Sequence, residues 1–411
     1  MTTCIERPAT APQWDRVGPP PHAPVRARFA EALFRNVVAE LPIRVALAGG
    51  ERLGAGGPDA PLMRVPDPAA FFHRLGADAK LGLGEAYMSG EWTSPDPAAL
   101  LTPFAERITR LVPRSLQPLR RWVERRRPAV ERNTPEGARR NISHHYDLSN
   151  EVFATFLDET MTYSSALFRP GSDDLADAQR NKIDRILDLA GVGAGTRLLE
   201  IGTGWGALAL RAAERGARVT SLTLSAEQAS MARRRIADAG LSGRVDVQLR
   251  DYRDAAGGYD AVVSVEMIEA VGAEYWPEYF QALDRLLLPG GRAAIQAITM
   301  PHDRMVATQH TYTWIHRYIF PGGIIPSVRS ITDNVRERTG LAMSESRSFG
   351  ADYARTLRHW RNRFLRRWPD VEALGFSRNF RRMWEFYLAY SEAGFRSGYL
   401  DVWQFRLDKT A

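Results

Sequence analysis

Three closely spaced glycines form a pattern that could hold a nucleotide-like ligand. Gly202, Gly204 and Gly206 stand in LLEIGTGWGALAL, where they follow a short apolar run and open a predicted helix. Glycine has no Cβ, so a turn built from it lets a ligand approach the backbone closely. The third glycine comes two residues after the second, whereas the dinucleotide fingerprint has three, and the acid Glu200 precedes the first glycine. This spacing favours S-adenosylmethionine over NAD.

Polar side chains follow the next two predicted strands, where a cofactor of this kind would extend. Nucleotide-binding sheets commonly end the second strand with an acid for the ribose, but this chain has LTLSAEQ, in which threonine and glutamine can hydrogen-bond a diol. Glu227 is the alternative ribose contact. The motif RDYRD after the third strand stands where an acid would meet the adenine amine. The predicted cofactor contacts here are Thr223, Leu224, Gln228, Asp251 and Tyr252.

A pair of histidines precedes the glycine loop in ISHHYDLSNEVF. His144 and His145 have no other His or Cys nearby at ligand spacing, so we expect no metal site. Either one could act as a general base, but a structural, hydrogen-bonded role is the better interpretation.

Alternating strands and helices must position these residues. Apolar, β-rich runs at 197–202, 218–224, 245–251, 259–268 and 290–300 are separated by helical stretches, which indicates a mostly parallel, doubly wound sheet. Two later runs, 341–350 and 399–409, could pair as an antiparallel hairpin at the edge. The predicted fold class is therefore α/β, with the Rossmann-like, seven-stranded sheet of class I methyltransferases.

The length of 411 residues indicates two domains. Residues 1–125 read as a small domain of mixed α/β structure, and residues 126–411 as the larger one. The polar, proline-containing segment 125–141, RRRPAVERNTPEGARRN, should connect them.

The charge of the chain predicts an anionic partner. Lys and Arg total 55 against 48 Asp and Glu, a net charge of +7, which would attract nucleic acid or anionic lipid headgroups. Arginine alternates with Trp and Leu in 114–127 and 355–368, as in a helix lying on a membrane surface. The alternative is a solvated Arg-rich face packed by its apolar side. The single Cys4 and the lack of about 18 consecutive apolar residues predict a cytoplasmic protein that neither is secreted nor spans a membrane.

Many motifs in a fixed order carry a family resemblance. They are HHYDLSNEVF, MTYSSALF, EIGTGWG, LTLSAEQ, DYRD, EMIEAVG, YIFPGGIIPS, FGADYARTL and FRRMWEFYLAY, with LGLGEAYMSGEW upstream. The chain resembles the cyclopropane-fatty-acyl-phospholipid synthase family from about residue 140 onward. The resemblance implies S-adenosylmethionine as methyl donor, unsaturated phospholipid acyl chains as acceptor, and a lipid-binding N-terminal domain. It also implies that the segment from Tyr146 to Ser165 closes over the cofactor, with Tyr163 and Ser164 near its methionine end.

The chemistry of that family demands a dry pocket. An isolated double bond is a poor nucleophile, and its methylation leaves a carbocation on the acyl chain. Aromatic faces exclude water and stabilise positive charge. The aromatic candidates are Tyr312, Trp314, Tyr318, Trp384 and Tyr387, with core packing as the alternative role for each.

A proton must then leave, and the resemblance implies bicarbonate as its acceptor. The matching positions, which we predict to be catalytic, are Ser165, Glu269, Gln296, Ile298 and Tyr353. This chain departs from the family pattern because Ser165 replaces Cys, while Gln296 and Ala270 replace His. A neutral amide cannot relay a proton as imidazole can, so the departures put ring closure in more doubt than methyl transfer.

Two products are therefore open. Loss of a methyl proton can close a cyclopropane ring directly, or a hydride shift can precede that loss and leave a methylene branch. We favour the second, a 10-methylene chain that a separate reductase would convert to tuberculostearic acid.

Two hypotheses of other classes compete. A nucleic-acid methyltransferase or binding module would explain the arginines, but no D/N-P-P-Y/F motif and no suitably placed cysteine support it. A noncatalytic lipid-binding protein would not need the glycine loop and Glu269. We therefore expect no nucleic acid, but an unsaturated phospholipid in an anionic membrane as partner, at the inner face of the cell membrane. A homo-oligomer remains open.

Overall fold

The computed structural model describes residues 17–108, 128, 133, 134, 137 and 149–410. Tyr146, the histidine pair and the Arg-rich segment 114–127 lie outside the described residues, so the predictions that concern them stay predictions.

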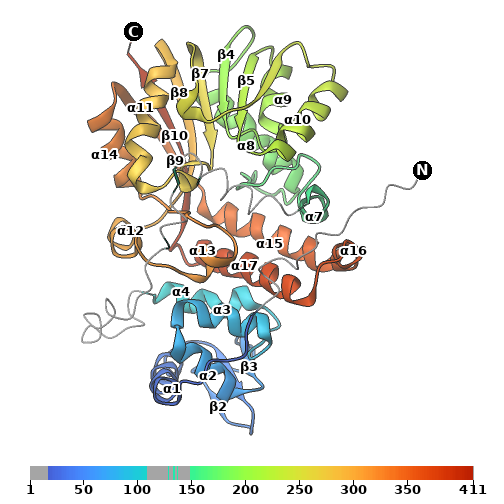
Figure 1. The fold of residues 1–411 in the computed structure, drawn as a ribbon, viewed down its shortest axis with the longest axis vertical. Coiled ribbons are helices and arrows are strands. Elements are labelled where there is room, and N and C mark those ends of the chain that lie inside the picture. Colours follow the sequence, from blue (N-terminus) through green and yellow to red (C-terminus); the bar gives the residue numbers. More distant parts are fainter. Residues whose placement is uncertain (1–16, 109–127, 129–132, 135–136, 138–148, 411) are drawn as a thin grey trace.

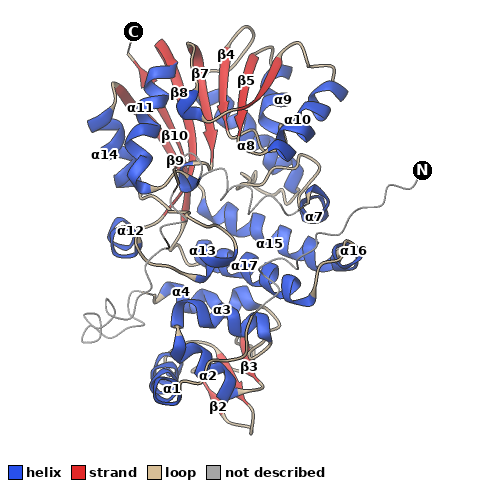
Figure 2. Cartoon of the chain, in the orientation of Figure 1, coloured by secondary structure: helices blue, strands red, loops and turns tan. Residues whose placement is uncertain are grey.

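A seven-stranded sheet forms the upper part of the molecule in Figures 1 and 2. Its strand order is β6-β5-β4-β7-β8-β10-β9, and the pairs from β6 to β8 are parallel, whereas β10 is antiparallel to both of its neighbours. The predicted α/β class and all seven predicted strands are confirmed. The strands are β4 Arg197–Ile201, β5 Arg218–Thr223, β6 Val245–Leu249, β7 Tyr259–Val265, β8 Leu287–Thr299, β9 Leu341–Ser348 and β10 Asp401–Lys409.

The last two strands were predicted to form a hairpin, and this prediction was wrong about how the chain connects them. Strands β9 and β10 do pair antiparallel, but three helices separate them in the chain: α15 Gly350–Arg366, α16 Trp368–Ala373 and α17 Arg378–Arg396. The long return lets β10 insert between β8 and β9 instead of lying at the edge. This insertion places Gln404 of β10 opposite Gln296 of β8, which matters for the site below.

Helices cover both faces of the sheet because its strands are apolar on both faces. Adjacent residues of a strand point to opposite faces, and Leu198 and Leu199 of β4 accordingly belong to different apolar cores. The core around Leu198 includes helices α8 Leu175–Leu189, α9 Ala207–Glu214 and α10 Ala226–Asp238. The core around Leu199 includes α11 Trp276–Leu286 and α14 Val328–Arg338.

The predicted Arg-rich helix forms as α15, with its apolar side inside the protein. Leu357, Trp360 and Phe364 are buried, and the helix packs against α17 and against α7 Asn150–Phe156. Arg358 and Arg366 are exposed. The structure therefore favours the solvated-face interpretation for this segment.

The N-terminal part is a small unit of mixed structure, as predicted. It contains α1 Pro24–Ala39, β1 Arg44–Leu47, β2 Arg52–Leu53, β3 Leu62–Val65, α2 Pro68–Ala77, α3 Ala79–Ser89 and α4 Pro97–Glu106, with strand order β2-β1-β3. Helices α3 and α4 pack against α17, so the long helices lie between this unit and the sheet (Figure 1). Its buried side chains and those of α15 and α17 form one apolar core. The predicted boundary at 125/126 falls outside the described residues.

Two short helices, α12 His302–Thr308 and α13 Trp314–Tyr318, follow β8. Among the described helices, none combines the length and apolar character needed to cross a membrane.

Candidate active site

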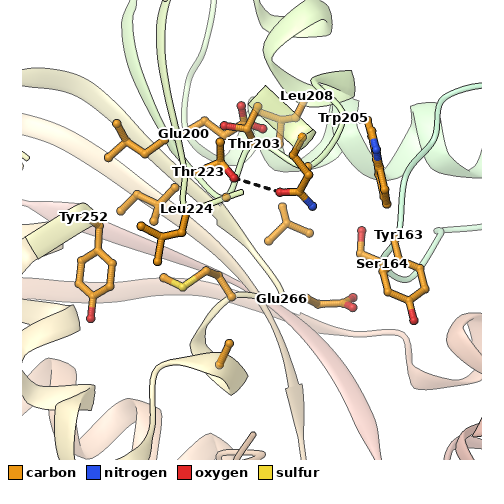
Figure 3. A pocket seen from close by; sticks show the side chains of 18 of the residues that line it. Tyr163, Ser164, Glu200, Thr203, Trp205, Leu208, Thr223, Leu224, Tyr252 and Glu266 are labelled. Carbon is orange, nitrogen blue, oxygen red and sulfur yellow. Dashed lines mark hydrogen bonds between the residues drawn. The ribbon is translucent and has the colours of Figure 1, made fainter. Parts of the chain in front are cut away.

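A pocket opens at the carboxyl ends of the central strands, next to the glycine loop (Figure 3). Strands β4 and β7 are neighbours there. From β4 the chain continues to β5 and β6 on one side, and from β7 it continues to β8 on the other. Ligands of open α/β sheets bind at such a switch point. Predicted cofactor contacts that line the pocket are Tyr163, Ser164, Gly202, Gly204, Thr223, Leu224, Gln228, Asp251 and Tyr252.

The three glycines have different roles in the structure. All have positive φ, 102° at Gly202, 51° at Gly204 and 86° at Gly206, a region that side chains with a Cβ disfavour. A Cβ added to Gly204 would project into open space, so this glycine keeps room for a ligand. Gly206 is not among the residues that line the pocket, and its direct cofactor contact stays a prediction. It precedes α9, and an added Cβ would lie 3.2 Å from the Cβ of Ala232, so it serves helix packing.

The polar residues after β5 and β6 are held by neighbours. The hydroxyl of Thr223 donates to the Gln228 side chain at 3.0 Å, drawn as the dashed line in Figure 3. Asp251 accepts from the Arg253 guanidinium, with Nη2 to Oδ2 at 2.6 Å, and both residues line the pocket. These groups offer hydrogen bonds to a ribose diol and an adenine.

An acid that sequence reasoning did not assign lies among three of the residues predicted to be catalytic. Oε1 of Glu266 accepts from the Ser165 backbone N at 2.9 Å and from Gln296 Nε2 at 2.7 Å, and Oε2 accepts from the Tyr353 hydroxyl at 2.9 Å. Three donors expected to hold bicarbonate thus hold a carboxylate of the chain itself. Bicarbonate stays a prediction, but one with a competitor inside the protein.

The backbone at Glu266 is unusual. Its φ is 50°, and among the described residues only Met161 is another non-glycine residue with positive φ. Both line the pocket. Such conformations cost free energy and concentrate at functional sites. The signal that could have found Glu266 is its place directly after the buried strand ending at residue 265.

Glu269 lies beside Glu266 with a different environment. Its Oε1 accepts from the Ile298 backbone N at 2.5 Å, whereas Oε2 is buried without a hydrogen-bond partner. Burial, and then repulsion from Glu266, raises the pKa of Glu269 to about 8. Burial also raises the pKa of Glu266, but Lys182 and the three donors oppose that effect. The pKa is therefore raised at both acids, and two adjacent acids ionise one after the other.

A buried lysine supports this arrangement and was missed by the sequence reasoning. Lys182 is 1% exposed, and its Nζ donates to Ser164 Oγ at 2.6 Å. Burial lowers its pKa to about 8, and the charges of Glu266, Asp158 and Glu200 counteract this. The signal was available, because Lys182 occupies a core position in the helical pattern of α8, next to Ile183.

Glu200, the acid before the glycine loop, also lines the pocket. It accepts from Ser221 Oγ at 2.5 Å, and burial raises its pKa to about 8.

Aromatic side chains lie beside the pocket, and one of the predicted aromatic residues, Tyr387, contacts a residue that lines it. Tyr163 lines the pocket, and its hydroxyl is 2.7 Å from that of Tyr387. Its ring lies 5.1 Å from Trp360 between centroids. None of Tyr312, Trp314, Tyr318, Trp384 and Tyr387 is among the lining residues. Trp314 packs so closely on α3 that a Cβ at Gly84 would lie 2.5 Å from its ring, which is a packing role.

Within the described residues, no group of three or more His, Cys, Asp and Glu side chains is arranged to hold a metal ion.

The parallel sheet, the glycine loop after β4 and the pocket at that end define a class I methyltransferase fold. The solved structure of the mycolic acid cyclopropane synthase CmaA1, complexed with SAH and CTAB, has this fold, with a TM-score of 0.61 and 30% identity over 69% of this chain and 99% of that chain. The chain belongs to the mycolic acid cyclopropane synthetase family, whose model matches residues 133–405.

Two curated relatives cover most of the chain. Tuberculostearic acid methyltransferase UfaA1 of Mycobacterium tuberculosis is 52% identical over 405 residues, 96% of this chain and 95% of the relative. Cyclopropane-fatty-acyl-phospholipid synthase of Escherichia coli is 36% identical over 356 residues, 83% of this chain and 86% of the relative. The family resemblance predicted from the motifs is confirmed.

Proposed function

We propose that this protein is a C-methyltransferase that transfers a methyl group from S-adenosylmethionine to the double bond of unsaturated acyl chains in membrane phospholipids and produces a 10-methylene chain. The observation that carries the proposal is Glu266, a carboxylate held by three donors at the wall of the glycine-loop pocket. The 52% identity to a tuberculostearic acid methyltransferase supports the methylene product over the cyclopropane alternative.

The residues of the pocket fit S-adenosylmethionine. The space at Gly204 gives a ligand close access to the backbone, Thr223 and Gln228 suit a ribose, and Glu200 is an acid beside the loop where a cationic amino-acid end would bind. The SAH in the CmaA1 structure supports the same cofactor. When bound, this cofactor supplies an electrophilic methyl group on a sulfonium.

The chain's own residues then handle the charge and the proton. Methylation of one alkene carbon leaves a cation on the other, which the aromatic residues around Tyr163 shield from water. A hydride shift from the methylated carbon moves the cation there. The Glu266 carboxylate accepts a proton from the new methyl group, and the C–H electron pair forms the methylene double bond. Glu266 thus takes the role that the family resemblance gave to bicarbonate.

The membrane and partner assignments belong to the same proposal. The protein acts in the cytoplasm at the inner face of the cell membrane, its N-terminal unit binds lipid, and a separate reductase consumes the methylene product. The net charge of +7 supports attraction to anionic lipid. Vesicle flotation at low and high salt tests this, because exposed charges are screened over about 8 Å at physiological ionic strength. Equal binding to neutral and anionic vesicles would contradict it.

The test of the activity is direct. Purified protein is incubated with S-adenosylmethionine and oleoyl phospholipid vesicles, and the acyl chain is identified by mass spectrometry and NMR. A methylene branch is expected. A cyclopropane ring would support the alternative activity, and an unmodified chain would contradict both.

A further inference from the structure

A line of hydrogen bonds runs from the Glu266 carboxylate across strands β8 and β10 toward the β9 edge of the sheet. Gln296 Nε2 donates to Glu266 Oε1 at 2.7 Å, Gln404 Nε2 donates to Gln296 Oε1 at 3.0 Å, and Arg185 Nη1 donates to Gln404 Oε1 at 2.8 Å. Gln296 and Gln404 are opposite each other in the antiparallel pair of β8 and β10, and both are at most 1% exposed.

The two ends of this line fix the orientation of both amides. A side-chain amide can present either oxygen or nitrogen to a neighbour. Arg185 can only donate, so Gln404 must turn its oxygen toward the guanidinium and its nitrogen toward Gln296. Gln296 must then present its nitrogen to Glu266, which as a carboxylate can only accept. At the outer end, Arg185 is held by Glu345 at 3.0 Å.

We propose that Arg185 and Gln404 are positioning residues that act through Gln296 to keep an amide donor on the catalytic carboxylate of Glu266. This inference rests on the proposed function of Glu266 as proton acceptor. Losing the orientation would turn the oxygen of Gln296 toward the carboxylate and replace an attraction by a repulsion.

Several other groups face Glu266 and influence its pKa in the wild type. They are Lys182 from α8, Tyr353 from α15, the Ser165 backbone and the neighbouring acid Glu269. Around Arg185 the charged groups are Glu345 and Arg347 of β9 and Asp188 of α8. None of these groups changes in the variants chosen below. Gln404→Glu and Arg185→Met each make the local charge more negative by one, which by itself raises the pKa of Glu266. Gln404→Met breaks the line without a change of charge and must therefore show the same direction of shift.

The sharpest variant is Gln404→Glu, which keeps the shape of the side chain. A carboxylate there still pairs with Arg185 but cannot donate, so it draws the nitrogen of Gln296 toward itself and away from Glu266. A carboxylate that loses a donor has a higher pKa. We expect kcat to fall at least about tenfold and the acidic limb of its pH profile to move up by about one pH unit. The affinity for S-adenosylhomocysteine should be unchanged.

The matched control is Gln281→Glu, the same chemical change at an exposed position of α11, which should leave kcat and its pH profile as in the wild type. Arg185→Met gives a second variant in case Gln404→Glu does not fold. It removes the obligate donor at the outer end, and the same upward shift is expected.

A readout without turnover separates this inference from the proposed function. The infrared carboxylate band that disappears in Glu266→Gln identifies Glu266, and its titration is followed in each variant. An upward shift in Gln404→Glu that also occurs in the uncharged Gln404→Met supports the positioning role. This holds even if the wild type makes no methylated lipid, an outcome that would contradict the proposed function alone. An unchanged titration of this band in folded variants would overturn the inference.

Discussion

The hydroxyl of Tyr353 donates to Oε2 of Glu266 at 2.9 Å, which joins helix α15 to the turn that follows β7. The Tyr353 ring is 7% exposed and lies 4.5 Å from Phe395 between centroids. Two segments 87 residues apart in the chain, the end of β7 and helix α15, therefore meet at one carboxylate oxygen with apolar surroundings.

Removing that donor should raise the pKa of the Glu266 carboxyl group without disturbing the fold. In Tyr353→Phe the ring keeps its packing, but Oε2 loses a hydrogen bond to a charged acceptor. We expect kcat to fall roughly tenfold or more, with the acidic limb of the pH profile shifted upward. Steady-state kinetics over a pH series measures both. Tyr259→Phe, at the opposite end of β7, is the matched control, and equal profiles for the two variants would refute the role of Tyr353.

Glu269 should make stability depend on pH. Its folded pKa of about 8 lies above the ordinary 4.5, so its stabilising contribution is complete below pH 4.5 and is lost as the pH rises to about 8. Glu269→Gln imitates the protonated acid and cannot ionise. Urea unfolding is measured at several pH values across this range. As the pH rises, the free energy of unfolding of the wild type should fall relative to that of the variant. Parallel pH dependences would show that Glu269 is not held protonated.

The same variant bears on catalysis. Because the proposed mechanism makes Glu266 the acceptor, Glu269→Gln should lose much less than the roughly 100-fold that a positioned base contributes. A larger loss would contradict this and would support a catalytic role for Glu269, which the family resemblance names among the positions that hold bicarbonate.

The glycine loop should not tolerate a side chain at its centre. Gly204 lines the pocket and has φ 51°, and a Cβ there would meet open space. Gly204→Val should abolish binding of S-adenosylhomocysteine, measured by calorimetry, because a β-branched residue resists this conformation and fills the space. A folded variant with unchanged affinity would show that the ligand binds elsewhere.

Local patterns in the sequence were sufficient for the sheet and the loop. Apolar runs, turn residues and glycine spacing reflect interactions between near neighbours, and they predicted the seven strands and the pocket around Gly202 and Gly204. They could not show that β10 inserts beside β8, because strand order depends on contacts between distant segments.

The central acid was missed for a related reason. The family pattern directed attention to Glu269, whereas the position of the Glu266 carboxylate depends on a left-handed backbone and on donors from three other segments. Lys182 was overlooked because a single charge in a helix is usually exposed, and only the buried pattern around it in α8 indicates otherwise.

The most direct test removes the Glu266 carboxylate and supplies bicarbonate in its place. Glycine suits φ 50° at this position, and Glu266→Gly frees the Ser165 backbone N, Gln296 and Tyr353 as donors. In bicarbonate-free buffer, we predict that the wild type keeps full turnover while Glu266→Gly loses at least about 100-fold with S-adenosylhomocysteine affinity intact, and that added bicarbonate restores the variant. A wild type that requires bicarbonate, or a Glu266→Gly variant with near-normal turnover in its absence, would contradict the assignment of Glu266 as the proton acceptor.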